Sequence, residues 1–242
     1  EFRISFCTLQ CAMLGIFAIV FLLAFLVCRH ALGRYEQVLR QGAREAAPTA
    51  HTGAEIARLF FASEEITDVE IVEHEGMTSN CFDPRRRRLF LTRETAGGAT
   101  LAAWAVALHE AGHAAQTGEA LGDVKWRQTV IRLTRYGPGF AVILAGALML
   151  MKFNARMAVF ACAGLCLAFL LLNLGTLAVE FNANARLRRF LEKHLERHPD
   201  ALERLGGHLS KVATREVGDL LRSPRFFLLS GLPGSGKIRP KS

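Results

Sequence analysis

The sequence predicts a mainly α-helical membrane protein with about three transmembrane helices and one small region of mixed α and β structure. Three observations support this fold class. Apolar residues make up 51% of the 242 residues, and they gather in three long runs. Shorter helical and alternating patterns lie between the first run and the second. Basic residues flank the runs, as they do on the cytoplasmic side of membrane proteins.

The first run follows a short N-terminal tail, residues 1–5, and covers residues 6–28. As a helix it is long enough to cross a hydrocarbon core of about 30 Å. Arg29 and His30 end it. A cleaved signal peptide with Arg3 in its basic segment is the alternative, but the run is long for one and no Ala-x-Ala-like site follows. We therefore expect residues 6–28 to form an uncleaved transmembrane helix.

The second and third runs, residues 136–151 and 157–179, predict a hairpin of two further transmembrane helices. Lys152 and Arg156 mark a tight turn between them. The second run is short for a span, and it begins at Gly137-Pro138, where proline is tolerated in a first helical turn. A hairpin returns the chain after residue 179 to the side of the membrane that it left.

The formal charge of +8 comes from basic residues that sit beside the apolar runs. These residues are Arg29, Arg34, Arg40 and Arg44 after the first run, Lys125, Arg127, Arg132 and Arg135 before the second, and Arg186, Arg188, Arg189 and Lys193 after the third. The pattern predicts a multi-pass protein of the cell's inner (plasma) membrane whose polar region, residues 29–135, faces the cytoplasm, with the lipid bilayer as a partner. Basic and aromatic residues do not alternate on one face, so we expect no nucleic-acid partner.

The polar region between the first two spans, residues 29–135, contains the mixed structure. A short amphipathic helix is expected over residues 54–62, and strands over residues 69–72 and 89–92. The first of these strands is a candidate edge strand for an extended peptide. A strong helix follows over residues 101–116. Beyond the hairpin, residues 180–225 predict an amphipathic helix with Leu202, Leu205, Leu209, Val212 and Leu220 at helical spacing, and residues 226–242 form a tail.

The helix over residues 101–116 carries the pattern His-Glu-x-x-His. His109 and His113 are four residues apart and therefore project from the same face, so that both imidazoles can reach one zinc ion. Glu110 lies too far around the helix to ligate easily and is placed to accept a proton from zinc-bound water. A chance pattern on an ordinary helix is the alternative. Two histidines and a glutamate are costly in an apolar stretch unless they are satisfied, which favours a metal site.

The third protein ligand of a catalytic zinc must come from elsewhere in the chain. Glu180 directly follows the third apolar run, where an unpaired carboxylate is unfavourable. Because two spans separate it from His113, it can meet the two histidines without crossing the bilayer. Asn184, one helical turn further on, is a candidate to orient a ligand, with an ordinary polar residue as the alternative.

These segments resemble the YugP family of bacterial membrane zinc metallopeptidases. His109-Glu110-Ala111-Gly112-His113-Ala114-Ala115-Gln116 matches the family's metal-binding helix, and Val179-Glu180-Phe181-Asn182-Ala183 matches its later segment. Asp83-Pro84 and Leu89-Phe90-Leu91 match upstream. The resemblance implies a zincin-like catalytic region over residues 29–135, one catalytic Zn²⁺ bound by His109, His113 and Glu180, and Glu110 as the catalytic residue.

The expected function is therefore that of a membrane-bound zinc endopeptidase, with a peptide or a membrane protein as substrate. Two alternatives remain: an HtpX-like quality-control zinc protease, suggested by the Glu-Phe-x-Ala-Asn pattern, and a membrane scaffold whose zinc is not catalytic. Residues 231–237 fit part of a phosphate-binding loop, but Ile238 replaces the Ser or Thr that such a loop requires after its lysine. We expect no nucleotide.

Overall fold

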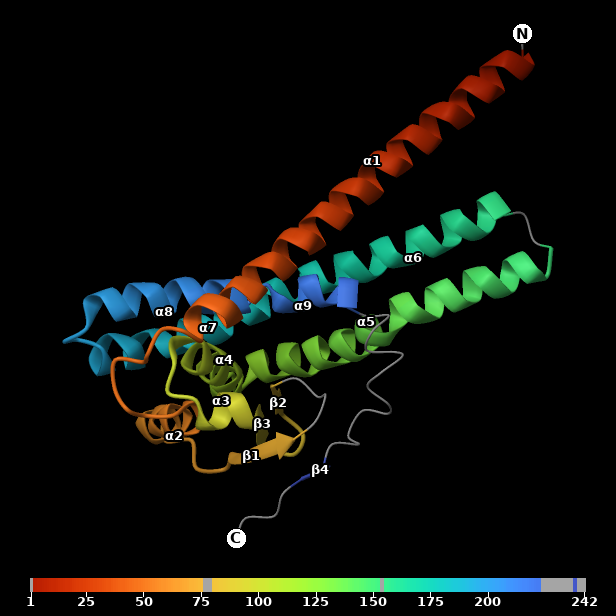
Figure 1. The fold of residues 1–242 in the computed structure, drawn as a ribbon. Coiled ribbons are helices and arrows are strands. Elements are labelled where there is room, and N and C mark those ends of the chain that lie inside the picture. The colour runs from red at the N-terminus through yellow and green to blue at the C-terminus, as the bar shows by residue number, and fades with distance from the viewer. Residues whose placement is uncertain (1, 76–79, 153–154, 223–236, 239–242) are drawn as a thin grey trace.

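The computed structural model describes residues 2–75, 80–152, 155–222 and 237–238, and Figure 1 shows its arrangement. Three long helices, α1, α5 and α6, extend from one end of the molecule, where the shorter helices and a small sheet gather. The helices are α1 (Phe2–Gln37), α2 (Gly53–Ser63), α3 (Arg93–Gly97), α4 (Leu101–Gly112), α5 (Glu119–Leu150), α6 (Ala155–Gly175), α7 (Leu177–His194), α8 (Pro199–Val212) and α9 (Arg215–Asp219). Single turns lie at η1 (Val38–Gly42), η2 (His113–Ala115) and η3 (Leu220–Arg222). The predicted mainly helical class is confirmed.

Two described helical stretches, Ala18–Gly42 and Met157–His194, are long and apolar enough to cross a membrane. A third candidate is the bent pair Glu119–Gly137 and Gly139–Leu150. The prediction of about three spans agrees with this count of two or three. α5 and α6 pack along each other as the expected hairpin (Figure 1). The protein is thus a membrane protein.

The helix that contains the second apolar run begins earlier in the chain than the sequence predicted. Residues 136–151 are only the far half of α5, which starts at Glu119. The polar half, from Glu119 to Arg135, continues the same helix into the compact end of the molecule (Figure 1). Hydropathy identifies the part of a helix that contacts lipid and not the point where the helix begins, because polar residues with good helix propensity extend it.

The sheet has the strand order β2-β3-β1-β4, with β1 (Glu70–Glu75), β2 (Cys81–Asp83), β3 (Arg88–Thr92) and β4 (Lys237–Ile238). β1 pairs in parallel with β3, whereas β2 pairs antiparallel with β3. Among the described residues, Glu70 to Glu73 pair only with β3, because β4 meets β1 at His74 and Glu75 alone, so the predicted edge position of residues 69–72 fits the described sheet. Apart from Lys237 and Ile238 in β4, the predicted tail from residue 226 and the rejected phosphate-loop pattern lie outside the described residues.

α4 is the centre of the core. All twelve of its residues are buried, and it packs against α2, α7 and α8. Thr100 caps its start, with its hydroxyl accepting the Ala103 N–H at 3.2 Å. The predicted amphipathic helix of residues 180–225 is divided into α7, α8 and α9, with Pro199 opening α8. Leu205 and Leu209 are buried in the core that includes α4, so the apolar face of this segment packs inside the protein.

Candidate metal centre

α4 and the turn that follows it present both histidines to one point. His109 lies in the last turn of α4, and His113 begins η2. Their side chains are 1% and 0% exposed, and their rings lie 5.1 Å apart between centroids. The spacing of four residues therefore produces the shared face that the sequence predicted.

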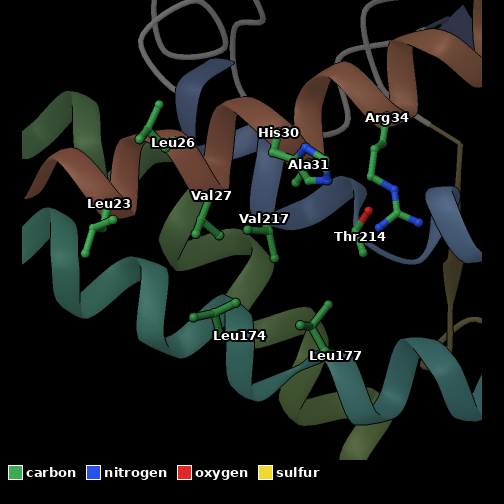
Figure 2. A pocket seen from close by; sticks show the side chains of 10 residues that line it. All are labelled: Leu23, Leu26, Val27, His30, Ala31, Arg34, Leu174, Leu177, Thr214 and Val217. Atoms are coloured by element: carbon green, nitrogen blue, oxygen red, sulfur yellow. The ribbon is translucent and has the colours of Figure 1, made fainter. Parts of the chain in front are cut away.

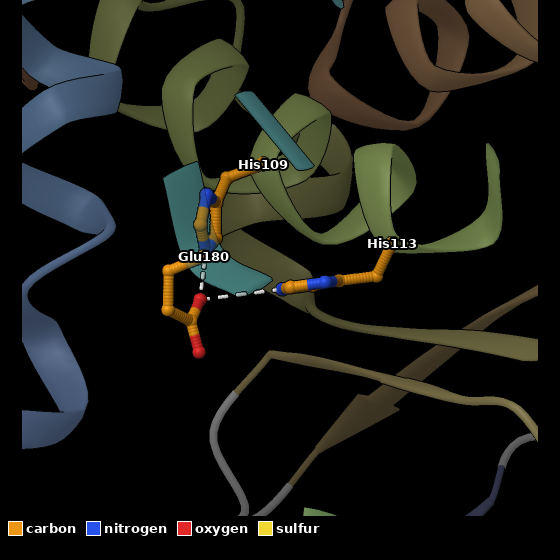
Figure 3. Close-up of side chains that lie close together, drawn as sticks. All are labelled: His109, His113 and Glu180. Carbon is orange, nitrogen blue, oxygen red and sulfur yellow. Dashed lines mark hydrogen bonds and ion pairs between the residues drawn. The ribbon is translucent and has the colours of Figure 1, made fainter. Parts of the chain in front are cut away.

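Glu180 reaches this face from the first turn of α7, which packs closely on α4. Gly112 makes the close approach possible, because a Cβ at that position would meet the Ala183 carbonyl oxygen at 2.5 Å. The Glu180 Oε2 lies 3.0 Å from the Nε2 of His109 and 3.3 Å from the Nε2 of His113 (Figure 3). Ligand atoms of the three residues all lie within 4.8 Å of one another. The structure thus brings together the three side chains that the sequence selected as metal ligands.

The other nitrogen of each ring is held by an amide. His109 Nδ1 lies 2.8 Å from Asn184 Oδ1, and Asn184 Nδ2 donates to the Leu209 carbonyl at 2.9 Å. His113 Nδ1 lies 2.7 Å from the Oε1 of Gln116, whose Nε2 donates to the Val179 carbonyl at 3.0 Å. Because each amide nitrogen already donates elsewhere, each amide oxygen accepts from the imidazole Nδ1–H. The nitrogen that each ring directs toward Glu180 is therefore Nε2.

This arrangement brings two ring nitrogens and one carboxylate oxygen, all common zinc-binding atoms, close together. Burial, reinforced by the positive charge of Arg127, lowers the pKa of His113 and favours its neutral form. Its Nε2 is buried without a hydrogen-bond partner. A tetrahedral zinc with bonds of about 2.0–2.1 Å needs ligand atoms about 3.3 Å apart, close to the observed 3.0 and 3.3 Å. The residues therefore fit a zinc ion.

Arg127 of α5 holds the carboxylate of Glu180 from the other side. Its Nε donates to Oε1, and its Nη2 lies 3.3 Å from Oε2. The Arg127 side chain is 3% exposed. The sequence had suggested a basic residue that flanks a membrane span, and that interpretation was wrong: Arg127 is an internal counter-charge for Glu180.

Glu110, the predicted general base, lies fully buried beside the cluster. Its Oε2 accepts the backbone N–H of Phe82 in β2 at 3.2 Å, and its Oε1 lies 3.1 Å from Nη2 of Arg215 in α9. Arg215 also contacts Glu216 at 2.6 Å. Although burial alone would lower the pKa of Arg215, the negative charges of Glu216 and Glu110 raise it well above its usual value. Arg215 is therefore a permanent cation next to Glu110.

The buried charges of the described residues favour a divalent cation. Four buried carboxylates, those of Glu110, Glu180, Glu216 and Asp219, face two buried guanidinium groups, those of Arg127 and Arg215. Four negative and two positive charges leave a formal charge of −2 in the interior. Half-buried Arg135 contributes from a distance to the charge environment of Glu216. Buried charge without compensation is costly, so a divalent cation such as Zn²⁺ would balance the cluster.

Cys81 lies close enough to Glu110 to suggest another kind of catalysis. Burial raises the pKa of its thiol to about 11, and the negative charge of Glu110 acts in the same direction. Cys81 therefore stays a thiol near neutral pH, whereas a nucleophile or a metal ligand would need the thiolate. Its environment gives no support to a cysteine nucleophile.

Sequence reasoning selected His109, Glu110, His113, Glu180 and Asn184. The structure brings the two histidines, Glu180 and Asn184 into contact, and the carboxylate of Glu110, next to His109 in α4, contacts Phe82 and Arg215. Sequence reasoning missed the roles of Arg127 and Arg215. A buried pair of a carboxylate with an arginine distant in sequence leaves no local pattern. The one available signal was the need of Glu110 and Glu180 for counter-charges.

A model of the family described as "Putative neutral zinc metallopeptidase" matches residues 12–215. The chain belongs to this zinc metallopeptidase family. The protein described as "Putative membrane protease YugP" of Bacillus subtilis is 31% identical over 148 residues, which is 60% of this chain and 64% of the relative. The predicted resemblance to the YugP family is confirmed. This chain spans slightly less than two thirds of that relative. No solved structure gives a significant match.

Proposed function

We propose that this protein is a membrane-bound endopeptidase that hydrolyses peptide bonds with one catalytic zinc. The observation that carries the proposal is the convergence of His109 Nε2, His113 Nε2 and Glu180 Oε2, three buried atoms of the kinds that bind zinc. Membership of a zinc metallopeptidase family supports the same conclusion. The site also contains Glu110, which a purely structural zinc site does not need.

His109, His113 and Glu180 would hold the zinc, which would polarise the scissile carbonyl and lower the pKa of the attacking water. Asn184 and Gln116 keep the two Nε2 lone pairs directed at this point. Glu110 accepts the proton of the attacking water as the new carbon–oxygen bond forms. It then donates that proton to the amine nitrogen as the carbon–nitrogen bond breaks. The Phe82 N–H and Arg215 hold the carboxylate in position for both transfers.

The membrane arrangement that we propose places the site on the cytoplasmic face of a bacterial plasma membrane. The elements that carry the site residues lie at the compact end of the molecule, and α1, α5 and α6 extend away from that end (Figure 1), which supports this arrangement. Reporter fusions after residues 45, 125 and 190 should report the cytoplasm, and a fusion after residue 154 the opposite side. A fusion at 154 on the same side as the other three would eliminate the hairpin.

The test of catalysis is the variant Glu110→Gln, with Glu119→Gln as the matched control because Glu119 is exposed. Purified protein in detergent micelles is assayed for bound zinc and for hydrolysis of fluorescently labelled casein. We expect both variants to keep one zinc per chain. Hydrolysis should fall by about 10²–10⁴-fold in Glu110→Gln only. Activity that survives this change would show that the proposed base is wrong, and a wild-type protein with zinc but no hydrolysis of any peptide would favour the scaffold.

A further inference from the structure

A pocket of about 360 Å³ lies between α1, the junction of α6 and α7, and α9, separate from the metal centre (Figure 2). One part of it is apolar and is lined by Leu23, Leu26, Val27, Leu174 and Leu177. The first three of these project from the part of α1 that lies within a candidate membrane span, Ala18–Gly42. They are 57%, 51% and 45% exposed, so this part of the pocket faces the hydrocarbon region of the bilayer.

The other end of the pocket is polar and basic. His30 and Arg34 of α1 line it together with Thr214, and Figure 2 shows the Arg34 guanidinium directed toward Thr214. No acidic side chain is among the residues that line the pocket. His30 and Arg34 follow the most apolar part of α1, where a spanning helix enters the head-group region. The apolar end of the pocket thus lies at the depth of lipid acyl chains, and its basic end lies at the depth of lipid head groups.

We propose that this pocket is a binding site for an anionic phospholipid, with an acyl chain in the apolar part and the phosphate against Arg34. Its volume is near the lower limit for ligand pockets, about 300–1,000 Å³. Since a water molecule takes about 30 Å³, the pocket has room for part of one chain and not for a peptide helix. The cationic group of a zwitterionic lipid would oppose Arg34, so the site should select net negative head groups.

The wall that α9 contributes connects this pocket to the catalytic centre. Thr214 and Val217 line the pocket, and Arg215 between them contacts Glu110. α9 lies directly on α1, because a Cβ at Gly218 would meet the Leu32 backbone nitrogen at 2.5 Å. A bound lipid would therefore contact the same short helix that supplies the partner of Glu110. The lipid site itself does not depend on the proposed peptidase activity.

Native mass spectrometry of the purified chain tests the site. The protein is equilibrated in micelles with equal amounts of dioleoyl phosphatidylglycerol and dioleoyl phosphatidylcholine, which share their acyl chains. One basic residue near a head group contributes about 1 kcal/mol, so we expect one retained phosphatidylglycerol with a preference of at least about fivefold. Arg34→Glu should abolish the preference, whereas Arg29→Glu on the same helix should keep it, because Arg29 is exposed and does not line the pocket.

Val27→Trp provides a second test at the apolar end. Val27 is 45% exposed, so the fold should tolerate the larger side chain, which would fill the entrance and reduce retention of both lipids. Equal loss of preference in Arg34→Glu and Arg29→Glu would show a general charge effect and overturn the proposal. Equal retention of the two lipids by the wild type, or unchanged retention in Val27→Trp, would overturn it as well.

Discussion

The helix α4 and the hairpin of α5 and α6 are both rich in apolar residues, but these residues have opposite environments. Every residue of α4 is buried, including His109 and Glu110. In the hairpin, Leu150 is 87% exposed, and Val142 and Leu171 are each 60% exposed. Apolar side chains on α4 stabilise a protein core around charges, whereas the exposed ones on the hairpin have lipid to contact. Substitution of an apolar residue should therefore lower the free energy of unfolding strongly in α4 and weakly at the exposed positions of the hairpin.

The largest expected effect comes from the counter-charge that α5 supplies to the core. Arg127→Met leaves Glu180 buried without its partner, which should lower the free energy of unfolding of the zinc-free protein by about 3–5 kcal/mol. Zinc should restore much of this loss, because the ion also neutralises Glu180. Chemical unfolding in detergent, with and without zinc, measures both values. Arg132→Met is the control, since Arg132 is exposed on the same helix; equal losses in the two variants would contradict an internal role for Arg127.

A slightly smaller effect is expected when one leucine of each region is truncated. Leu108 is 0% exposed in α4, so Leu108→Ala removes core contacts and leaves a cavity, at about 2–5 kcal/mol. Leu150→Ala removes contacts with lipid or detergent alone and should change the free energy of unfolding by less than about 0.5 kcal/mol. Unfolding midpoints of the two variants compare the regions directly. A large loss in Leu150→Ala would mean that the end of the hairpin packs against protein.

Two glycine substitutions compare how closely the backbone is packed at the end of α4 and in the hairpin. Gly112→Ala places a methyl group against the Ala183 carbonyl and should force α7 away from α4, at about 1–3 kcal/mol. Glu180 would move with α7, so zinc affinity should fall as well. Gly146→Ala in α5 meets no atom within 4 Å and should be neutral or slightly stabilising. Zinc titration and thermal unfolding measure the pair; unchanged zinc affinity in Gly112→Ala would contradict the close packing of α4 and α7.

The smallest expected effect is a pH dependence of stability, which arises from His113 in the core and has no counterpart in the hairpin. Because burial lowers the pKa of His113 in the folded protein, the unfolded chain binds a proton there more readily, with an ordinary pKa of about 6.5. The stability of the zinc-free protein should therefore fall as the pH drops below about 6.5, and His113 should have no effect well above that value. Unfolding curves between pH 5 and pH 8 test this. His113→Asn should remove part of the dependence, and an unchanged profile in that variant would assign it to other groups.

Much of the site could be predicted because several of its residues lie at short, regular spacings in the sequence. His109 and His113 share a helical face, and two intervening spans return Glu180 to the same side. Arg127 could not be identified in this way, because a basic residue before an apolar run looks the same whether it contacts head groups or a buried carboxylate. Arg215 contacts Glu110 across a long sequence separation, and no local pattern records that contact. The three-residue strand β2, which donates a backbone N–H to Glu110, was too short to show an alternating pattern.

The central claim is that Glu180 completes a zinc site with His109 and His113. Zinc-edge X-ray absorption of the purified protein tests it directly, alongside total metal analysis of the variant Glu180→Ala. We predict one zinc per wild-type chain, with two imidazole nitrogens at about 2.0–2.1 Å and carboxylate oxygen in the same shell. The variant should lose most of its zinc or show a shell without that carboxylate. Full zinc content with an unchanged spectrum in Glu180→Ala would contradict the account.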